Sequence, residues 1–425
     1  MAKATSERAD EAVRRDPAQP REHIGYDILI LDAEHKQSLA SARSLGRAGL
    51  RVALGESLDQ YRARPPLPAF RSRYCTRAVV FPSYADEPDA YAAAVMAFVR
   101  ENPTRVVLPA GDATCATLMP HRKELADLGS VLVLPSDSAL AIAFDKDRTL
   151  EVARELGIGY PRSMRIGSVE ELSAAAADYG FPFVLKPTIS WNGKTRVRVA
   201  PVEVVNKTEA ADTAGRFLAG GAAILAQEFV PGRREGVTLF IVDGEVMASC
   251  GHVEHRTTPA LGGASVMRES IVTPPDVNTA AVRLAKAIGL EGVCEVEFRR
   301  AADGRPLLME INPRLPGTIG TSIRSGVDFP LLIWQQATGQ PITRIETHRS
   351  GVRTRWLHGD LRWLRDNQKR AGRPDSVSRA LGIWTFVSEF ARTRHYDYFD
   401  WRDIRPSIAE MRYSAAVIRK SLREQ

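Results

Sequence analysis

The sequence predicts an α/β protein that begins with a parallel-sheet domain and ends in a helical C-terminal extension. Three observations support this prediction. First, strand and helix patterns alternate through residues 25–135. Second, residues 136–345 contain a helix followed by strands and turn signals. Third, amphipathic helical patterns fill most of residues 346–425. Strands that alternate with helices form parallel sheets covered on both faces. We therefore expect three parts with these boundaries.

The first part opens with a buried strand at residues 26–32 and a helix at 37–49 that stops at Gly49. The alternation then continues with strands at 51–55, 106–111 and 131–135 and a helix from Tyr91 to Arg100. No Gly-x-Gly-x-x-Gly fingerprint follows the first strand, which argues against a dinucleotide site here. We expect this domain to contribute to substrate binding instead.

Length and composition describe a globular protein of more than one domain. The chain has 425 residues, of which 44% are hydrophobic and 26% charged. No run approaches the roughly 18 apolar residues that would span a bilayer. Residues 1–24 lack the apolar core of a secretory signal, so a disordered leader is expected. Four widely spaced cysteines suit a reduced, cytoplasmic protein.

The formal net charge of +7 raises the question of nucleic acid binding. Arginine is spread along the whole chain, and no basic run alternates with stacking aromatic residues, as a nucleic-acid surface would require. No nucleic acid partner is therefore expected. A basic chain of this kind suits small anionic molecules such as nucleotide phosphates and carboxylates.

The middle of the chain has an unusual buried lysine. A helix over residues 144–157 ends at Gly157, and the apolar strand FPFVLKP, residues 181–187, contains Lys186 as its one charge. An unpaired ammonium in such a strand is costly, so Lys186 needs an anion. A further strand, 224–232, ends at a Pro-Gly break.

The segment GVCEVEFRRAADGRPLLMEINPRLPG, residues 292–317, predicts a hairpin with a turn at Asp303-Gly304. In its second strand Glu310 and Asn312 are two residues apart and leave the same face of the pleat, and Glu297 can join them from the first strand. Carboxylate and amide oxygens without Cys or His suit Mg²⁺, which completes its shell with phosphates. The alternative is a hairpin with solvated acids, which a Glu-Ile-Asn-Pro-Arg strand end disfavours.

Taken together, these elements resemble the ATP-grasp superfamily over residues 26–340. The motifs follow in order: DK, KP, Q-E-x-x-x-G-x-x-E, and E…E-x-N-P-R. The resemblance implies a two-lobed ATP-grasp domain at 136–345, in which ATP lies between two antiparallel sheets. One sheet belongs to a small mobile lid at about 183–232. The loop after Lys186 departs from the family pattern, because it has one glycine, Gly193, where several are usual.

The resemblance also implies residue roles at the nucleotide. Lys146 and Lys186 match the phosphate-binding lysines. Glu228, Phe229 and Val230 match the hinge that pairs with adenine, and Glu235 matches a carboxylate that binds the ribose.

Metal and catalytic roles follow from the same resemblance. Glu297, Glu310 and Asn312 match the magnesium ligands, with Mn²⁺ as an alternative ion. Arg314 matches an arginine beside the transferring phosphoryl group. The segment 252–270 lies where many members have a loop over the acceptor, and its Arg256 is a candidate for binding phosphate or a carboxylate. His252 and His255 are alternatives for a base.

These groups suit phosphoryl transfer from ATP to a carboxylate, followed by attack of an amine. The first hypothesis is therefore an ADP-forming carboxylate-amine ligase with small-molecule substrates and, by analogy with the superfamily, a homodimeric state. The second is an enzyme that activates bicarbonate, and the third is a nucleotide-binding module without turnover. The acceptor pocket should involve residues 33–38, 252–270 and 315–325. The basic C-terminal helices are expected to pack on the core rather than on a membrane surface.

Overall fold

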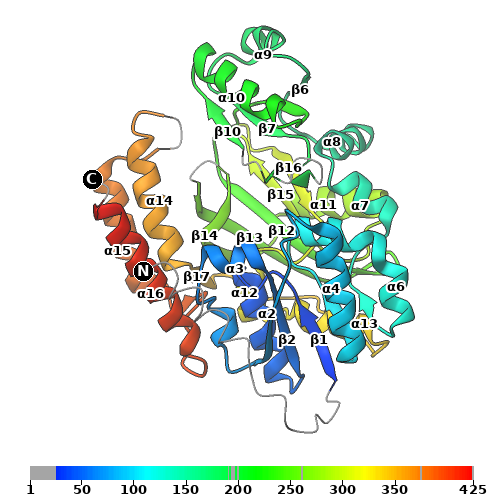
Figure 1. Cartoon of the computed structure of the whole chain (residues 1–425). Helices are drawn as coiled ribbons and strands as arrows, with labels where there is room; N and C mark the ends of the chain where they lie inside the picture. Colours follow the sequence, from blue (N-terminus) through cyan, green and yellow to red (C-terminus); the bar gives the residue numbers. More distant parts are fainter. Residues whose placement is uncertain are drawn as a thin grey trace.

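The computed structural model describes residues 25–189, 191–192, 197–198, 201–259, 262–373 and 376–423. The leader predicted at 1–24 and part of the loop after Lys186, including the glycine noted above, lie outside these residues. The fold class is confirmed: a parallel sheet, two antiparallel sheets and a set of C-terminal helices succeed one another along the chain. Figure 1 shows their arrangement, with helices α9 and α10 of the small sheet at the top and β1 and β2 of the parallel sheet at the bottom.

The N-terminal sheet has five parallel strands in the order β3-β2-β1-β4-β5. Its strands are β1 (Tyr26–Ile30), β2 (Val52–Ser57), β3 (Cys75–Phe81), β4 (Thr104–Leu108) and β5 (Val131–Leu132). Its helices are α2 (Lys36–Arg47), α3 (Leu58–Ala63), α4 (Pro88–Glu101), α5 (Asp112–Leu118) and α6 (Arg122–Asp127). The strand order reverses between β1 and β4, so the loops after these two strands diverge and form a crevice. Strand β3 was not predicted, since this edge strand is largely exposed and has no clear apolar pattern.

The small sheet, called the lid below, is antiparallel with the order β10-β7-β11-β6. It comprises β6 (Ser163–Ile166), β7 (Phe183–Pro187), β10 (Val202–Val204) and β11 (Ile224–Glu228), with α9 (Leu172–Tyr179) and α10 (Lys207–Ala219). Strand β6 precedes the lid boundary predicted at 183. A two-stranded ribbon, β8 (Trp191–Asn192) and β9 (Val197–Arg198), follows β7.

The large sheet has seven strands in the order β16-β15-β12-β13-β14-β17-β18. They are β12 (Arg234–Val242), β13 (Glu245–Thr258), β14 (Ala264–Ile271), β15 (Gly292–Arg300), β16 (Pro306–Asn312), β17 (Arg353–Arg355) and β18 (His395–Tyr396). The accompanying helices are α7 (Asp137–Ala143), α8 (Lys146–Glu155), α11 (Pro275–Ile288), α12 (Ile319–Ser325) and α13 (Phe329–Ala337). The predicted β15–β16 hairpin is present, with Gly304 at φ +85° in its turn, where a side chain would be strained.

The C-terminal part contains α14 (Leu357–Lys369), α15 (Arg379–Arg392) and α16 (Arg405–Arg423), which lie together along one side of the molecule (Figure 1). It also supplies β17 and β18, which extend the large sheet beyond β14. The prediction of helices alone was therefore incomplete, because strands of two or three residues leave no periodic pattern.

The apolar clusters in the core show which parts of the molecule are packed against each other. One apolar cluster joins residues of the parallel sheet, such as Ile28 and Val106, to Phe240 and Val293 of the large sheet. The lid has a separate cluster that includes Phe183, Leu185 and Ala226. Since a part with its own core can shift without breaking another, the lid is the part suited to rigid-body motion.

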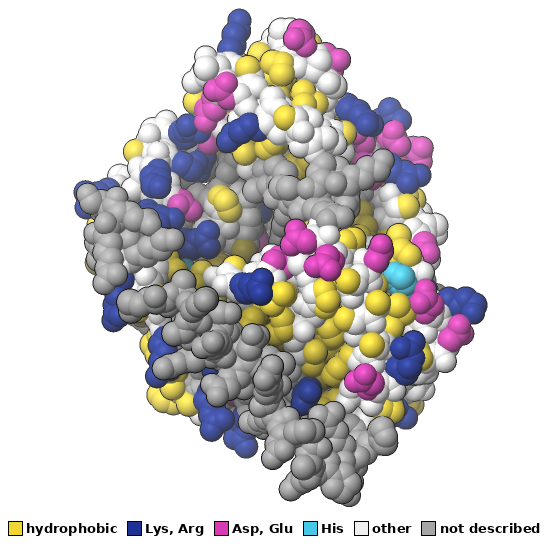
Figure 2. All heavy atoms as spheres, in the orientation of Figure 1, with side chains coloured by type: hydrophobic (Ala, Val, Ile, Leu, Met, Phe, Trp, Pro, Cys, Tyr) yellow, Lys and Arg dark blue, Asp and Glu magenta, His cyan; other side chains and the backbone are white. Residues whose placement is uncertain are grey.

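Charged side chains of both signs are mixed on the molecular surface (Figure 2). On the face shown in Figure 2, Lys and Arg side chains are interspersed with Asp and Glu rather than gathered into one basic stripe. None of the described helices is long and apolar enough to cross a membrane. The four cysteines are free thiols.

The lid contacts the C-terminal part through ion pairs. Arg370, just after α14, donates to the Glu203 carboxylate of β10 at 2.5 Å, and Arg373 donates to Glu209 of α10 at 3.2 Å. Glu203 is 4% exposed, so these arginines meet a carboxylate that has little access to water. We call this contact the lid latch.

We predict that Glu203→Gln loosens the lid without unfolding it, because the buried carboxylate loses its charge and the charge-assisted bond weakens. Hydrogen exchange of the β10 and α10 amides should accelerate by roughly tenfold. The exposed Glu170→Gln on the same lid is the matched control. Unchanged exchange in α10 would show that the latch does not hold the lid.

Candidate active site

A cavity of about 490 Å³ lies where the lid, the large sheet and the N-terminal domain meet. We call it the central cavity. Its lining includes the loops after β1 and β4, strands β7 and β11 of the lid, and the β15–β16 hairpin. Residues from three parts of the chain thus face one open cleft, as in the binding clefts of enzymes.

Lys146 and Lys186 both line the central cavity. Asp145 caps α8 by accepting from the amides of Asp147 and Arg148, and the Lys146 amide donates to the Thr188 carbonyl at 2.9 Å, which ties α8 to the segment after β7. The Lys186 ammonium donates to Gln227 at 2.9 Å. Burial and the charge of Lys146 lower the pKa of Lys186 to about 8, so an anion between the two lysines would stabilise both charges.

The hinge residues Glu228, Phe229 and Val230 also line the central cavity. Arg299 of β15 organises this segment, because its guanidinium donates to the Val230 carbonyl at 2.9 Å and lies 5.9 Å from the centre of the Phe229 ring. Arg162 donates to the Glu228 carboxylate at 2.9 Å from the outer side of the lid. Two arginines therefore hold the hinge segment beside the cavity.

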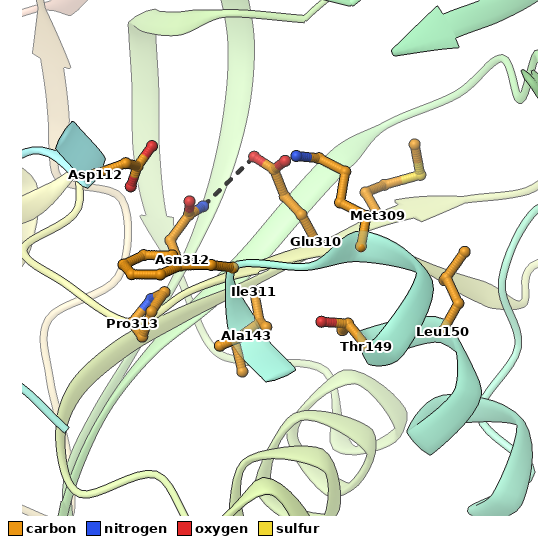
Figure 3. Close-up of a pocket in the computed structure, with 11 residues that line it drawn as sticks. Asp112, Ala143, Thr149, Leu150, Met309, Glu310, Ile311, Asn312 and Pro313 are labelled. Atoms are coloured by element: carbon orange, nitrogen blue, oxygen red, sulfur yellow. Dashed lines mark hydrogen bonds between the residues drawn. The ribbon is translucent and has the colours of Figure 1, made fainter. Parts of the chain in front are cut away.

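The β15–β16 register brings the expected metal ligands together. Glu297 lies directly opposite Glu310, and the Asn312 amide nitrogen lies 3.0 Å from the Glu297 carboxylate and 3.5 Å from that of Glu310. Figure 3 shows Asn312 and Glu310 pointing toward each other, with Asp112 across from them. Among the described residues no three His, Cys, Asp or Glu side chains form a metal cluster, so these two carboxylates and one amide are the candidate set.

The electrostatics of this set suit a divalent cation. Burial and the carboxylates of Glu310, Glu295 and Glu254 raise the pKa of Glu297 well above its ordinary value. Burial also disfavours ionisation of Glu310, but Lys146 and Lys186 outweigh it and hold the pKa of that carboxyl below its ordinary value. A cation held by Glu297 and Glu310 would relieve the repulsion between them, and Mg²⁺ accepts such oxygen ligands.

Arg314 is fixed at the boundary between domains. Its guanidinium donates to both carboxylate oxygens of Asp112, at the start of α5, and to the Asn312 side-chain oxygen at 3.3 Å. Although burial opposes the charge, Asp112 raises the pKa of Arg314, so the guanidinium stays protonated. The N-terminal domain therefore positions the arginine beside the candidate metal ligands.

The structure does not bring Glu235 or Arg256 to the central cavity. Glu235 lies on the opposite face of β12, where Arg233 and Arg300 hold its carboxylate at 2.6 and 2.5 Å. Arg256 follows a bulge in β13 and turns to the C-terminal helices, where it donates to Asp360 at 2.8 Å. Neither side chain is placed to contact a ligand in the cavity. The position of Glu235 therefore does not support ribose binding, and that of Arg256 does not support binding of a phosphate or carboxylate there.

The two candidate histidines are also placed away from the central cavity. His252 is 3% exposed and lies 3.4 Å from Glu295, behind that cavity-lining carboxylate. His255 contacts Glu269 at 3.0 Å on the outer side of the sheet, and burial lowers its pKa. Neither is positioned as a base in direct contact with a ligand.

All three segments expected at the acceptor pocket reach the central cavity. They contribute His35, Lys36 and Gln37 from 33–38, Gly262–Ser265 from 252–270, and Gly317 and Thr318 from 315–325. The segment 252–270 also contributes Glu254, whereas sequence reasoning missed four other lining residues: Asp112, Arg234, Glu295 and Arg299. Alternation gave a signal for Glu295, which is two residues before Glu297 on the same strand.

Comparisons with known proteins agree with this geometry. The family model described as "ATP-grasp in the biosynthetic pathway with Ter operon" matches residues 223–359. A formate-dependent phosphoribosylglycinamide formyltransferase of Synechococcus sp. is 28% identical over 302 residues, covering 69% of this chain and 70% of the relative. Carbamoyl phosphate synthase large chains also match, but the chain spans only about a fifth of their length, for example 22% of the protein from Deinococcus deserti.

Solved structures share the fold at low identity. The biotin carboxylase domain of the Hydrogenobacter thermophilus 2-oxoglutarate carboxylase, a dimer in complex with MgADP and bicarbonate, has a TM-score of 0.59 and 16% identity, with 77% of this chain and 73% of that chain covered. An L-amino acid ligase from Bacillus licheniformis has a TM-score of 0.57 and 17% identity, with 78% and 79% covered. The family model and these relatives make the chain similar to members of the ATP-grasp superfamily.

We predict that Lys186→Ala weakens Mg·ATP binding by about 10- to 100-fold, because a buried ammonium–phosphate contact is lost. Isothermal titration calorimetry measures the dissociation constant directly. Lys207→Ala, on the exposed start of α10 in the same lid, should bind as the wild type does. Equal affinities in the two variants would remove the phosphate role of Lys186.

Proposed function

We propose that the protein is an ATP-dependent ligase that activates a carboxylate as an acyl phosphate and couples it to an amine. ADP and phosphate are released, and an amide or peptide-like bond forms. The observation that carries this proposal is the convergence of Lys146, Lys186 and Arg314 with Glu297 and Glu310 around one cavity beneath a lid. Cations on one side and paired carboxylates on the other are what Mg·ATP requires.

Each group has a role that its position supports. Lys146 and Lys186 would bind the phosphates from the α8 and lid sides, and the hinge at Glu228–Val230 would hold the adenine through its backbone. Glu297, Glu310 and Asn312 would hold Mg²⁺, with Mn²⁺ as a substitute. The bound ion would neutralise charge on the phosphates. Arg314, held by Asp112, would stabilise negative charge on the phosphoryl group in flight.

The two chemical steps balance without a further reactant. A carboxylate oxygen attacks the γ-phosphorus, the bond to the ADP oxygen breaks, and an acyl phosphate forms. The amine nitrogen then attacks the acyl carbon, phosphate leaves with the bonding electrons, and the amine gives up a proton. Because water would hydrolyse the acyl phosphate, closure of the lid over the cavity protects the intermediate.

A second candidate is the activation of bicarbonate in place of an organic carboxylate. Carbamoyl phosphate synthases among the relatives and a carboxylase domain bound to bicarbonate among the similar structures favour it. The same lysines, metal ligands and arginine would serve, since bicarbonate also offers an oxygen nucleophile. The identity of the acid therefore decides between the two candidates.

The deciding experiment measures ADP release from Mg·ATP with small carboxylates and amino acids, singly and in pairs, with hydroxylamine as a trap for the acyl phosphate. Bicarbonate forms a separate arm. Acid-dependent ADP release with a hydroxamate product is the expected result and names the carboxylate. ADP release stimulated by bicarbonate alone would favour the second candidate, and no stimulation by any acid would contradict both.

We predict that Glu310→Gln lowers turnover by at least about a thousandfold, because the neutral amide weakens the metal site and with it the stabilisation of the transferring phosphoryl group. Circular dichroism should show an unchanged fold, since the side chain lines a cavity rather than the apolar core. Exposed Glu151→Gln on α8 is the control. Turnover of Glu310→Gln near that of the control would exclude Glu310 as a metal ligand.

A further inference from the structure

One end of the central cavity is built by the start of α2, far along the chain from the nucleotide-binding motifs. His35, Lys36 and Gln37 line it there, and α2 continues for 12 residues. The first amides of a helix have no partner within the helix, and the helix dipole favours negative charge at this end. This geometry suits an anion but does not by itself define a site.

Lys36 places a buried amino group at this end. Its side chain is 8% exposed, its ammonium donates to the Ser265 carbonyl, and it lies 5.7 Å from the centre of the Trp356 ring. A Cβ at Gly317 would approach Lys36 Cε to 3.3 Å, so glycine leaves room for this lysine stem. The ammonium is thus held between the N-terminal domain and β14.

Burial leaves the ammonium of Lys36 poorly solvated. Burial and the neighbouring Arg268 lower its pKa to about 7, although Asp397, Glu254 and Glu295 act in the opposite direction. Asp397 is itself engaged, because it accepts from Arg268 at 3.1 Å. An anionic group in the cavity would stabilise the charged form of Lys36.

The Ser265 hydroxyl gives a second, independent sign of a ligand. The residue lines the central cavity and is 4% exposed, yet its Oγ has no hydrogen-bond partner among the described residues. A buried hydroxyl without a partner is costly, and such groups are normally satisfied by protein, water or ligand. The hydroxyl and the Lys36 ammonium belong to one wall of the cavity.

Two carboxylates line the same part of the cavity. Glu295 accepts from the Thr318 hydroxyl at 2.6 Å, and Glu254 lies 3.2 Å from Arg234. Both line the central cavity together with Lys36, and both act on its ammonium electrostatically. Carboxylates so placed favour an ammonium group on the ligand.

We propose that this end of the cavity binds an amine acceptor that also carries an anionic group, such as a carboxylate or a phosphate. Lys36, the Ser265 hydroxyl and the first turn of α2 bind the anion, and Glu254 and Glu295 face the amine. This inference rests on the proposed function. It restricts the amine substrate of the proposed ligase to an amino acid or an amino phosphate, and it excludes simple alkylamines as substrates.

Binding of small probes tests this subsite in the full chain with Mg·ADP present. Glycine, glycinamide and aminomethylphosphonate are compared by saturation-transfer difference NMR in the wild type, Lys36→Met and Ser265→Ala. Glycine and glycinamide share the amine and differ in the anion, and the phosphonate distinguishes a carboxylate from a phosphate-like group. Lys286→Met, which removes an exposed lysine of α11, is the matched control.

We expect the wild type and the control to bind glycine or the phosphonate at least about tenfold more tightly than glycinamide, since an ion pair and its hydrogen bonds are lost with the amide. Lys36→Met should lose this preference while its Mg·ADP affinity stays unchanged, and Ser265→Ala should reduce it. Equal binding of acid and amide, a preference that survives in Lys36→Met, or binding of no probe would overturn the subsite. Failure of the proposed function would instead appear as wild-type protein that does not bind Mg·ADP.

Discussion

The structure depends on attraction between the carboxylates and the cationic side chains that line the central cavity. The apolar strands around the cavity offer these charges little solvation, so each charge needs a partner of opposite sign. Glu295, Glu297 and Glu310 face inward from β15 and β16, and burial, together with repulsion from Glu310 and Glu295, raises the pKa of Glu297 well above its usual range. Lys146 and Lys186 compensate part of this charge. A cluster of this kind is costly without its ligands, which explains why three separate parts of the chain supply its counter-charges.

Each counter-charge comes with its own structural support. Asp112 of the N-terminal domain fixes Arg314, Gln227 of the lid fixes Lys186, and Glu254 of β13 pairs with Arg234. Because the N-terminal and large sheets share one apolar cluster, the Asp112–Arg314 contact is rigid. Lys186 is different, since it belongs to a lid with a separate core. Motion of the lid would therefore change the distance of one phosphate-binding charge while the others stay in place.

Features of the site that lie within one short segment could be predicted from sequence. The face of a strand on which a particular side chain lies could not. The β15–β16 hairpin, with Glu297 opposite Glu310, follows from a turn signal and alternation within one short segment. The side chain of Glu235 lies on the face of β12 away from the cavity, because successive residues of a strand face opposite sides and Arg234 lines the cavity. Arg256 failed because β13 has a bulge between Glu254 and Arg256, which redirects the following side chain.

Contacts between residues far apart in the chain could not be predicted from sequence either. Asp112 meets Arg314 across 202 positions, and no pattern in either segment indicates the other. The acceptor segments 33–38 and 315–325 could be proposed only as stretches, because the choice of Lys36 as the lining charge depends on the packing of α2 against β14 and Gly317. The fold thus decides which of several polar residues in a predicted segment faces the cavity.

The C-terminal part connects these elements through buried ion pairs rather than through a core of its own. Arg43 of α2 pairs with Asp403 at 2.9 Å, and Arg268 of β14 pairs with Asp397. Buried pairs add little net stability but penalise every alternative packing. They therefore fix α2 and β14 relative to each other, and these are the two elements that carry Lys36 and Ser265. Through the lid latch the same part of the chain also contacts the lid, so one C-terminal segment constrains both the acceptor end and the nucleotide end of the central cavity.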